Sequence, residues 1–127
     1  MNSQQQKQNI QSFKDLIVWQ KGIELTQEIY KTTAKLPSEE RFGLTSQMRR
    51  SAVSIPSNIA EGRQRRSRKD FAQFLHIAQG SAAELETQIV ITEKLYSDID
   101  FSKAKALMEE IQKMLAKLRK NIRNPVT

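Results

Sequence analysis

The sequence predicts an all-α protein in which four helices form an antiparallel, up-down-up-down bundle. Its 127 residues contain four Gly and three Pro, too few for the tight turns of a hairpin-rich sheet, while abundant Gln, Glu, Lys, Ala and Leu favour helix. Two long stretches repeat apolar residues at alternating steps of four and three, which is the spacing of one helix face. The connections between the expected helices are too short to cross over, so neighbouring helices should run antiparallel.

The first helix is expected from Ser12 or Asp15 to Leu36. Residues 1–11 precede it as a Gln-rich tail without apolar periodicity. Ser12 and Asp15 have the spacing of a capping box, and Pro37 disfavours a helical conformation for the residue before it. Apolar residues of this helix form two rows, which are Leu16, Trp19, Ile23, Tyr30 and Val18, Leu25, Ile29.

The second helix is expected from about Gly43 to Glu61, after a short capped turn over residues 38–42. Pro56 lies inside this helix, where it removes one backbone hydrogen bond and kinks the axis. Gly62 is interpreted as the C′ residue that ends the helix. The expected inner face consists of Leu44, Met48, Ala52, Ile55 and Ile59.

The third helix carries an unbroken heptad row about 30 residues long, and Ser67 with Asp70 predicts its capped start. The row consists of Phe71, Leu75, Ala78, Ala82, Leu85, Ile89, Thr92 and Tyr96. A second row beside it has polar residues at its centre and consists of Phe74, Ile77, Ser81, Glu84, Gln88, Ile91 and Leu95. The doubled rows of the first and third helices exceed what a monomeric core requires, so we expect self-association.

The fourth helix is expected to start near Asp100 or Ser102 and to end at Asn124-Pro125. Its inner face consists of Ala104, Met108, Ile111, Leu115, Leu118 and Ile122. The predicted organisation is therefore one bundle domain over residues 12–123 between the tail of residues 1–11 and a C-terminal tail of residues 124–127.

The net charge of +7 is unevenly distributed along the chain. Residues 41–69 carry eight basic residues and one acidic residue, whereas residues 70–110 have a net charge of −5 and residues 111–127 a net charge of +5. Five cations occur within seven residues at the junction of the second and third helices: Arg63, Arg65, Arg66, Arg68 and Lys69. The last helix adds Lys117, Arg119, Lys120 and Arg123. We expect two separate basic patches at opposite ends of the bundle.

Two interpretations of these cations stay open. The arginine cluster of residues 63–69 has the composition of a phosphate-binding surface, but it also suits a solvated loop that pairs with acidic residues. Cations at the end of the last helix are favourable there in any case, so we assign them a supporting role. For Arg49 and Arg50 an ion pair with Glu61 or Glu84 is favoured over direct contact with nucleic acid.

Several classes of function are disfavoured by the residues that the chain lacks. Without cysteine there is no disulfide, thiolate metal site or thiol nucleophile, and a cytoplasmic protein is the expectation. The longest apolar run, residues 16–19, is far shorter than the roughly 20 residues of a membrane span. His76 is the single histidine, and the chain has no Gly-rich phosphate loop and no nucleophile elbow. We therefore predict a protein that is not an enzyme and has no metal or cofactor.

Five motifs in order resemble the bacterial four-helix bundle family of 23S rRNA intervening-sequence proteins. They are FKDLIVWQK at 13–21, LPSEE at 36–40, GLTSQMRRSA at 43–52, SIPSNIAEG at 54–62, and FLHIAQGS with ELETQ within 74–88. This resemblance implies a homopentameric ring. It also extends to the accessory variability proteins of diversity-generating retroelements, which bind a reverse transcriptase and nucleic acid. Matching positions that the resemblance marks as assembly or binding determinants are Arg49, Arg50, Pro56, Asn58, Glu61, Gly62, Ser81, Glu84 and Glu86.

These observations lead to one main hypothesis and one alternative. The main hypothesis is a homopentameric helical bundle that binds structured RNA or DNA through the cluster of residues 63–69, assisted by the cations of the last helix. The alternative is a protein–protein adaptor whose basic surface docks a partner such as a reverse transcriptase, with no binding of nucleic acid by the chain itself. Attachment to an anionic membrane is a weaker hypothesis, because no exposed Trp or Leu adjoins the basic clusters.

Overall fold

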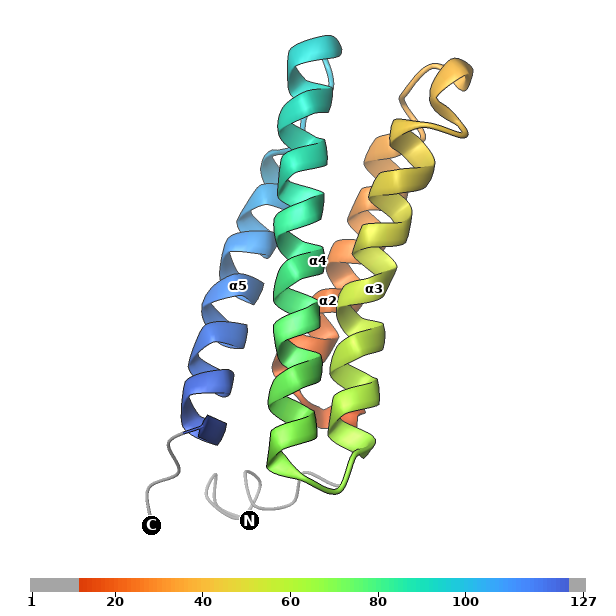
Figure 1. The fold of residues 1–127 in the computed structure, drawn as a ribbon. Coiled ribbons are helices and arrows are strands. Elements are labelled where there is room, and N and C mark those ends of the chain that lie inside the picture. Colours follow the sequence, from red (N-terminus) through yellow and green to blue (C-terminus); the bar gives the residue numbers. More distant parts are fainter. Residues whose placement is uncertain (1–11, 124–127) are drawn as a thin grey trace.

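A computed structural model describes residues 12–123 of the chain, and the predicted all-α, four-helix fold is confirmed (Figure 1). The two expected tails, 1–11 and 124–127, lie outside the described residues, as does the expected stop at Asn124-Pro125. The elements are the 3-10 turn η1 (Phe13–Asp15), α2 (Ile17–Thr33), the 3-10 turn η2 (Ser38–Glu40), α3 (Leu44–Gln64), α4 (Arg68–Leu95) and α5 (Ser102–Arg123).

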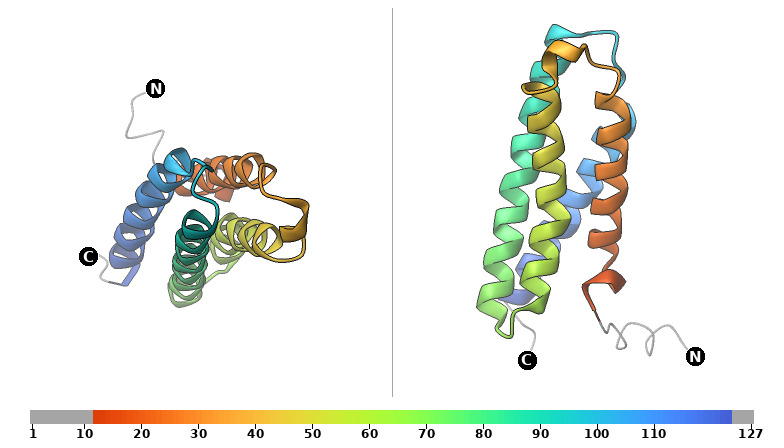
Figure 2. Two further views of the ribbon diagram at one scale, coloured as in Figure 1. Left: turned by 90° about the horizontal axis from the view of Figure 1, so that it is seen from above. Right: turned by 90° about the vertical axis from the view of Figure 1, so that its right-hand side faces the viewer.

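The four long helices alternate in direction, so that α2 and α4 run one way and α3 and α5 the other (Figures 1 and 2). Each long helix packs on the two helices next to it in the chain order α2, α3, α4, α5, and α5 closes the arrangement on α2. The ends of the bundle are therefore the connection between α3 and α4 at the bottom of Figure 1, and the other two connections at the top.

The start of the first helix differs from the prediction. The Ser12 and Asp15 capping box forms, with Lys14 N donating to Ser12 Oγ at 3.1 Å and Ser12 N donating to Asp15 Oδ2 at 3.3 Å. It caps only the short turn η1, because Leu16 is extended and α2 begins at Ile17. The same helix ends at Thr33 rather than Leu36, since the chain is already turning toward Pro37.

Gly62 does not end a helix, which corrects the prediction. Helix α3 continues to Gln64 and its C-cap is the extended residue Arg65. Gly62 is buried instead where α3 approaches α4, and a Cβ at this position would lie 2.7 Å from Cβ of Phe74 and 3.1 Å from Cδ1 of Phe71. The glycine is thus required by the close approach of two helices rather than by a turn.

The predicted heptad rows form the core. Fully buried side chains include Leu75, Leu85 and Ile89 of α4 and Ile111 and Leu115 of α5. Pro56 of α3 packs on Gly22 of α2. A Cβ added to Gly22 would lie 3.2 Å from the Cβ of Pro56. Two buried residues outside the predicted rows complete the core at the α5 end, Phe101 and Leu107.

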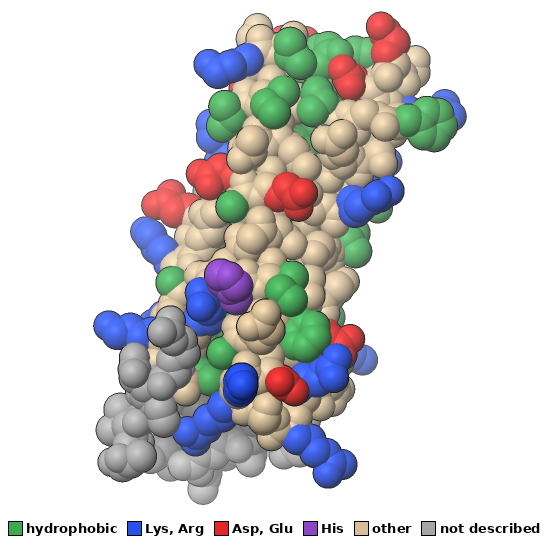
Figure 3. Space-filling model, viewed as in Figure 1, with side chains coloured by type: hydrophobic (Ala, Val, Ile, Leu, Met, Phe, Trp, Pro, Cys, Tyr) green, Lys and Arg blue, Asp and Glu red, His purple; other side chains and the backbone are tan. Residues whose placement is uncertain are grey.

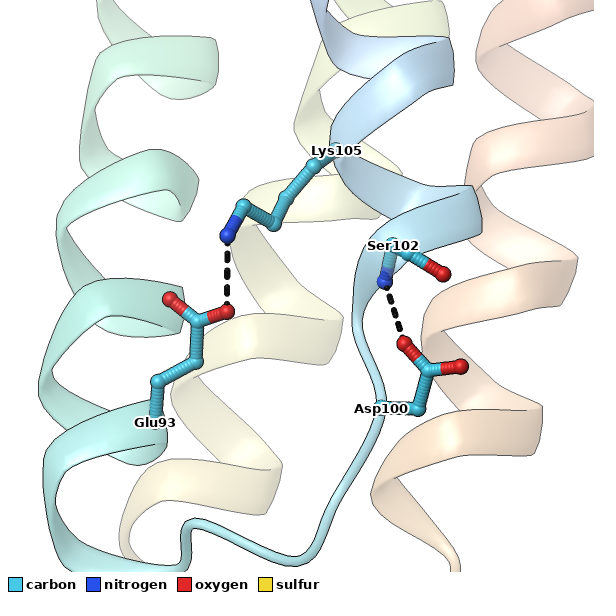
Figure 4. A network of polar contacts seen from close by, with 4 residues as sticks. All are labelled: Glu93, Asp100, Ser102 and Lys105. Carbon is cyan, nitrogen blue, oxygen red and sulfur yellow. Dashed lines mark hydrogen bonds and ion pairs between the residues drawn. The ribbon is translucent and has the colours of Figure 1, made fainter.

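Polar contacts fasten the top of the bundle. The hydroxyl of Tyr96, at the end of α4, donates to Glu40 Oε2 at 2.6 Å, and Leu44 N donates to the other oxygen of the same carboxylate at 3.3 Å. This carboxylate therefore links the α2–α3 connection to α4. In the neighbouring connection Asp100 accepts from the backbone N–H of Ser102, the first residue of α5, at 2.9 Å, while Lys105 pairs with Glu93 across α4 and α5 at 2.8 Å (Figure 4).

We expect Gly62→Ala to destabilise the fold by about 1–3 kcal/mol, because the new methyl group has no space between α3 and α4. Gly80→Ala is the matched control: it lies in α4 with no heavy atom within 4 Å of the added Cβ. The control should stabilise the protein by about 0.5–1 kcal/mol through helix propensity. Urea unfolding followed by circular dichroism measures both changes, and equal effects of the two substitutions would refute the packing argument.

The hydrogen bond to Glu40, assisted by burial, raises the pKa of Tyr96 above its ordinary value. Because the folded-state pKa is the higher one, this contact stabilises the fold below the ordinary tyrosine pKa of about 10, and its contribution is lost as the pH rises through the folded-state value. Titration of phenolate absorbance should show a later transition, above the ordinary tyrosine value, that belongs to Tyr96. The later transition should disappear in Tyr96→Phe and shift downward in Glu40→Gln, and an unchanged titration in Glu40→Gln would contradict the assignment.

Candidate nucleic-acid interface

The turn between α3 and α4 presents the five cations of residues 63–69. Ser67 caps the start of α4 by accepting a hydrogen bond from Asp70 N at 3.1 Å, so the chain reverses within three residues, 65–67. Arg63 is half-buried, and the other four cations are exposed: Arg65, Arg66, Arg68 and Lys69. The tight reversal holds these side chains together at one end of the bundle.

Two contacts position Arg65 in this turn. Its Nη2 pairs with Glu61 Oε2, one helical turn earlier, at 3.0 Å, and its guanidinium lies 4.9 Å from the ring centroid of Phe74 in α4. Glu61 is thereby assigned a role in orienting Arg65. Arg66, Arg68 and Lys69 form no ion pair with any carboxylate of the described residues.

The cations at the end of α5 lie at the same end of the molecule as this turn, which corrects the expectation of two patches at opposite ends (Figure 1). The reason is topological: with four alternating helices, the second connection and the end of the fourth helix point the same way. Lys117 and Lys120 are exposed, whereas Arg119 donates through Nη1 to Gln79 Oε1 of α4. The side chain of Arg123 lies outside the described part of the chain.

We call this surface the basic end. Its members are Arg63, Arg65, Arg66, Arg68, Lys69, Lys117, Arg119 and Lys120. Figure 3 shows Lys and Arg side chains gathered over the lower part of the molecule with some acidic side chains among them, and further acidic side chains higher up. Many acidic residues are also engaged elsewhere, as in the ion pairs Lys21–Glu110 and Lys113–Glu109 at 3.0 and 3.2 Å. At the basic end itself cations outnumber the acidic residues next to them in sequence, which are Glu61 and Asp70.

Arg49 and Arg50 do not form the expected ion pairs with Glu61 or Glu84. The guanidinium of Arg49 stacks 4.4 Å from the ring centroid of Tyr30, donates to Thr33 Oγ1 at 3.0 Å, and donates to the Tyr30 carbonyl at 3.2 Å. Arg50 is exposed and makes no hydrogen bond or ion pair with the described residues. Both arginines lie near the top of α3, far from the basic end.

Of the remaining residues singled out in the sequence, Asn58, Ser81 and Glu84 lie along the contact between α3 and α4, whereas Glu86 accepts from Gln112 Nε2 of α5 at 3.4 Å. Asn58 Nδ2 donates to the carbonyl and to Oγ of Ser54 at 2.8 and 2.9 Å, and Ser54 Oγ lies 2.7 Å from Ser81 Oγ on α4. Further along the same interface Glu84 Oε1 accepts from Ser51 Oγ at 3.5 Å. These contacts place Asn58 and Glu84 in the helix interface rather than at the basic end.

Two residues that organise the basic end were not predicted. Phe74 supports Arg65 and Gln79 holds Arg119, each from α4. Phe74 carries a sequence signal, because it stands in the second apolar row next to the cationic turn. Gln79 carries none, since its partner lies 40 residues away and depends on how α5 packs on α4.

Residues 12–123 present neither a metal-binding cluster nor a membrane-spanning helix. No group of three or more His, Asp or Glu side chains there is arranged to hold a metal ion. His76 is exposed on α4. Among the same residues, no helix combines the length and the apolar character needed to cross a membrane.

Residues 14–117 match the family described as 23S rRNA-intervening sequence protein. The structure is also similar to the crystal structure of a protein of unknown function from the S23 ribosomal protein family of Bacteroides thetaiotaomicron. The two chains are 29% identical, the match covers 82% of this chain and 99% of the other, and the TM-score is 0.70. No curated protein matches this chain significantly.

Proposed function

This chain belongs to the 23S rRNA-intervening sequence protein family, and on that premise we propose that it is a non-enzymatic, homopentameric helical bundle that binds RNA or DNA at the basic end. The observation that carries the proposal is the convergence of two cationic segments, residues 63–69 and 117–120, at one end of the bundle with few carboxylates to neutralise them. Arginine forks at such density suit phosphate groups, whose neutralisation releases counterions. The binding is expected to be independent of sequence.

A ring of copies strengthens this proposal. A single cluster of a few cations binds phosphate weakly, but identical clusters on one rigid assembly gain avidity when one nucleic acid reaches several of them. The apolar groove between α2 and α3 is a surface that such a ring would cover. It is lined by Trp19, Ile23, Val53 and Ala60, and Ile23 and Val53 are among the exposed large apolar side chains.

A second candidate function is a protein–protein adaptor, with a reverse transcriptase or another partner that itself carries nucleic acid. It is favoured by apolar side chains of α4 that are exposed to solvent, namely Ile77, Val90, Ile91 and Leu95. An adaptor would retain its partner after nuclease treatment and would itself fail to bind oligonucleotides at low salt. That combination of results would replace the first proposal.

The first test is binding to duplex RNA and DNA at about 50 and 200 mM salt. We expect micromolar or tighter binding at low salt that weakens steeply as salt rises. A variant with four alanines should show a less steep salt dependence; the substituted residues are Arg63, Arg65, Arg66 and Arg68. The magnitude of the slope of log K against log salt should decrease by about one for each phosphate that these arginines neutralise. The matched control replaces four exposed lysines at the top of the bundle by alanine, Lys31, Lys35, Lys94 and Lys103, and should retain most of the affinity. Equal losses in both variants would refute the assignment to the basic end.

The second test is the mass in solution. Light scattering after size exclusion should give a mass near five times 14.6 kDa. Ile23→Glu places a charge in the α2–α3 groove and should lower the mass while leaving helicity intact, because Glu is a good helix former. Ala116→Glu, an exposed position of α5, introduces the same charge as a control and should leave the mass unchanged. A monomeric wild-type mass would refute the ring.

A further inference from the structure

A second cationic surface lies at the top of the bundle, between α2 and the start of α3. Three arginines, Arg41, Arg49 and Arg50, and two aromatic residues, Tyr30 and Phe42, line a shallow groove of about 460 Å³. No carboxylate is among the side chains that line it. We call this surface the arginine–aromatic groove.

Phe42 is the unusual member of the groove. It is 88% exposed, the highest value among the large apolar side chains of the described residues, although it belongs to an ordered connection next to the N-cap residue Gly43. The guanidinium of Arg41 lies 5.7 Å from its ring centroid. An aromatic ring that stands free in water beside a cation offers a flat face for stacking.

The three arginines differ in how tightly they are held. Arg49 is fixed on Tyr30 by its stacking and by two hydrogen bonds to α2, so it supplies a stationary positive charge. Arg50 and Arg41 keep their N–H donors available, because neither forms a hydrogen bond or ion pair with the described residues. The nearest acidic neighbour in the chain, Glu40, is occupied by Tyr96 and by Leu44 N.

We propose that the arginine–aromatic groove binds a single-stranded segment of nucleic acid, with one unpaired base stacked on Phe42 and the adjoining phosphates on Arg41 and Arg50. The inference rests on the proposed function and adds a second, chemically different contact to it. Only an unpaired base can present its face to a protein ring, since the bases of a duplex are already stacked on one another. The cations supply the electrostatic part of the binding and the ring supplies the preference for single strands.

A second copy of this chain is the less suitable occupant of the groove. Covering it with a second copy would require that copy to present carboxylates opposite three arginines whose groove contains none. Desolvating such charges is costly unless the covering surface supplies matched anions. A phosphate backbone supplies them at every nucleotide.

The groove lies at the start of α3 and the basic end follows its last turn, so they are separated by at most the length of this 21-residue helix, roughly 30 Å. One copy therefore holds two contacts that engage different parts of a nucleic acid. The combination fits a structured RNA or DNA with both a duplex and an unpaired stretch.

The test uses the full chain and two probes, a uridine oligonucleotide of about 12 nucleotides and a duplex RNA, with fluorescence anisotropy as the readout. Phe42→Ala should weaken binding of the uridine oligonucleotide by about 5- to 100-fold, the effect of losing one base stack, and should change duplex binding less than about twofold. Phe42→Trp should restore the affinity, and the fluorescence of the new indole should be quenched by the oligonucleotide. The same comparisons are made in the background of the four alanines at the basic end, where the groove is the main remaining contact.

The outcomes separate this inference from the proposed function. One outcome would refute the groove assignment and leave the proposed function supported. In it, Phe42→Ala leaves the affinity for the uridine oligonucleotide unchanged in both backgrounds, while the basic-end variant loses duplex binding. If the wild-type chain binds neither probe, the groove assignment and the proposed function are both refuted. A lowered mass of Phe42→Ala in light scattering would also overturn the inference, because it would assign Phe42 to a contact between copies.

Discussion

The close packing of α3 on α4 is the contact on which the rest of the structure depends. Small residues make it possible: Gly62 faces Phe74 at the lower end, Ala78 and Ala82 are fully buried along its length, and Ser54 meets Ser81 between them. Because the two helices approach so closely, three residues are enough to reverse the chain between them. The cations of residues 63–69 are consequently confined to one tight turn instead of being spread along a loop. The same packing fixes Phe74, on which Arg65 stacks.

The positive surfaces of this molecule depend more on where the acidic residues lie than on the number of cations. Three carboxylates of the middle and upper parts pair with lysines on neighbouring helices, in Lys21–Glu110, Lys103–Glu28 and Lys105–Glu93. Such exposed ion pairs contribute little to stability, typically less than about 1 kcal/mol each. Their larger consequence is electrostatic, because they neutralise the sides of the bundle and leave the basic end as a local positive surface. The arginine–aromatic groove is a second one, produced by arginines that contact aromatic rings instead of carboxylates.

The helices and their buried faces could be predicted because they depend on local periodicity. The rows of α4 and α5, including Leu75, Ile89 and Ile111, follow from steps of four and three alone, and these side chains are buried. The errors arose wherever a residue serves contacts that are distant in sequence. Gly62 has the sequence context of a helix stop, but Phe74 of the next helix determines its role. Arg49 was expected to find a carboxylate and instead lies on Tyr30, since the ring and two acceptors of α2 are presented together only in the fold.

The polar residues inside the α3–α4 interface explain how two binding surfaces stay aligned. An interface made only of apolar side chains can slide along the helix axis with a small change in buried area, whereas paired polar groups satisfy their hydrogen bonds in one register. Asn58, Ser54 and Ser81 form such a group near the middle of the interface, and Ser51 with Glu84 forms another one turn higher. At the top, Tyr96 at the end of α4 donates to Glu40 in the connection that leads into α3. A shift of one turn would break all three groups at once and would also separate Arg65 from Phe74. The register set by these few polar contacts therefore determines the distance and orientation between the basic end and the arginine–aromatic groove.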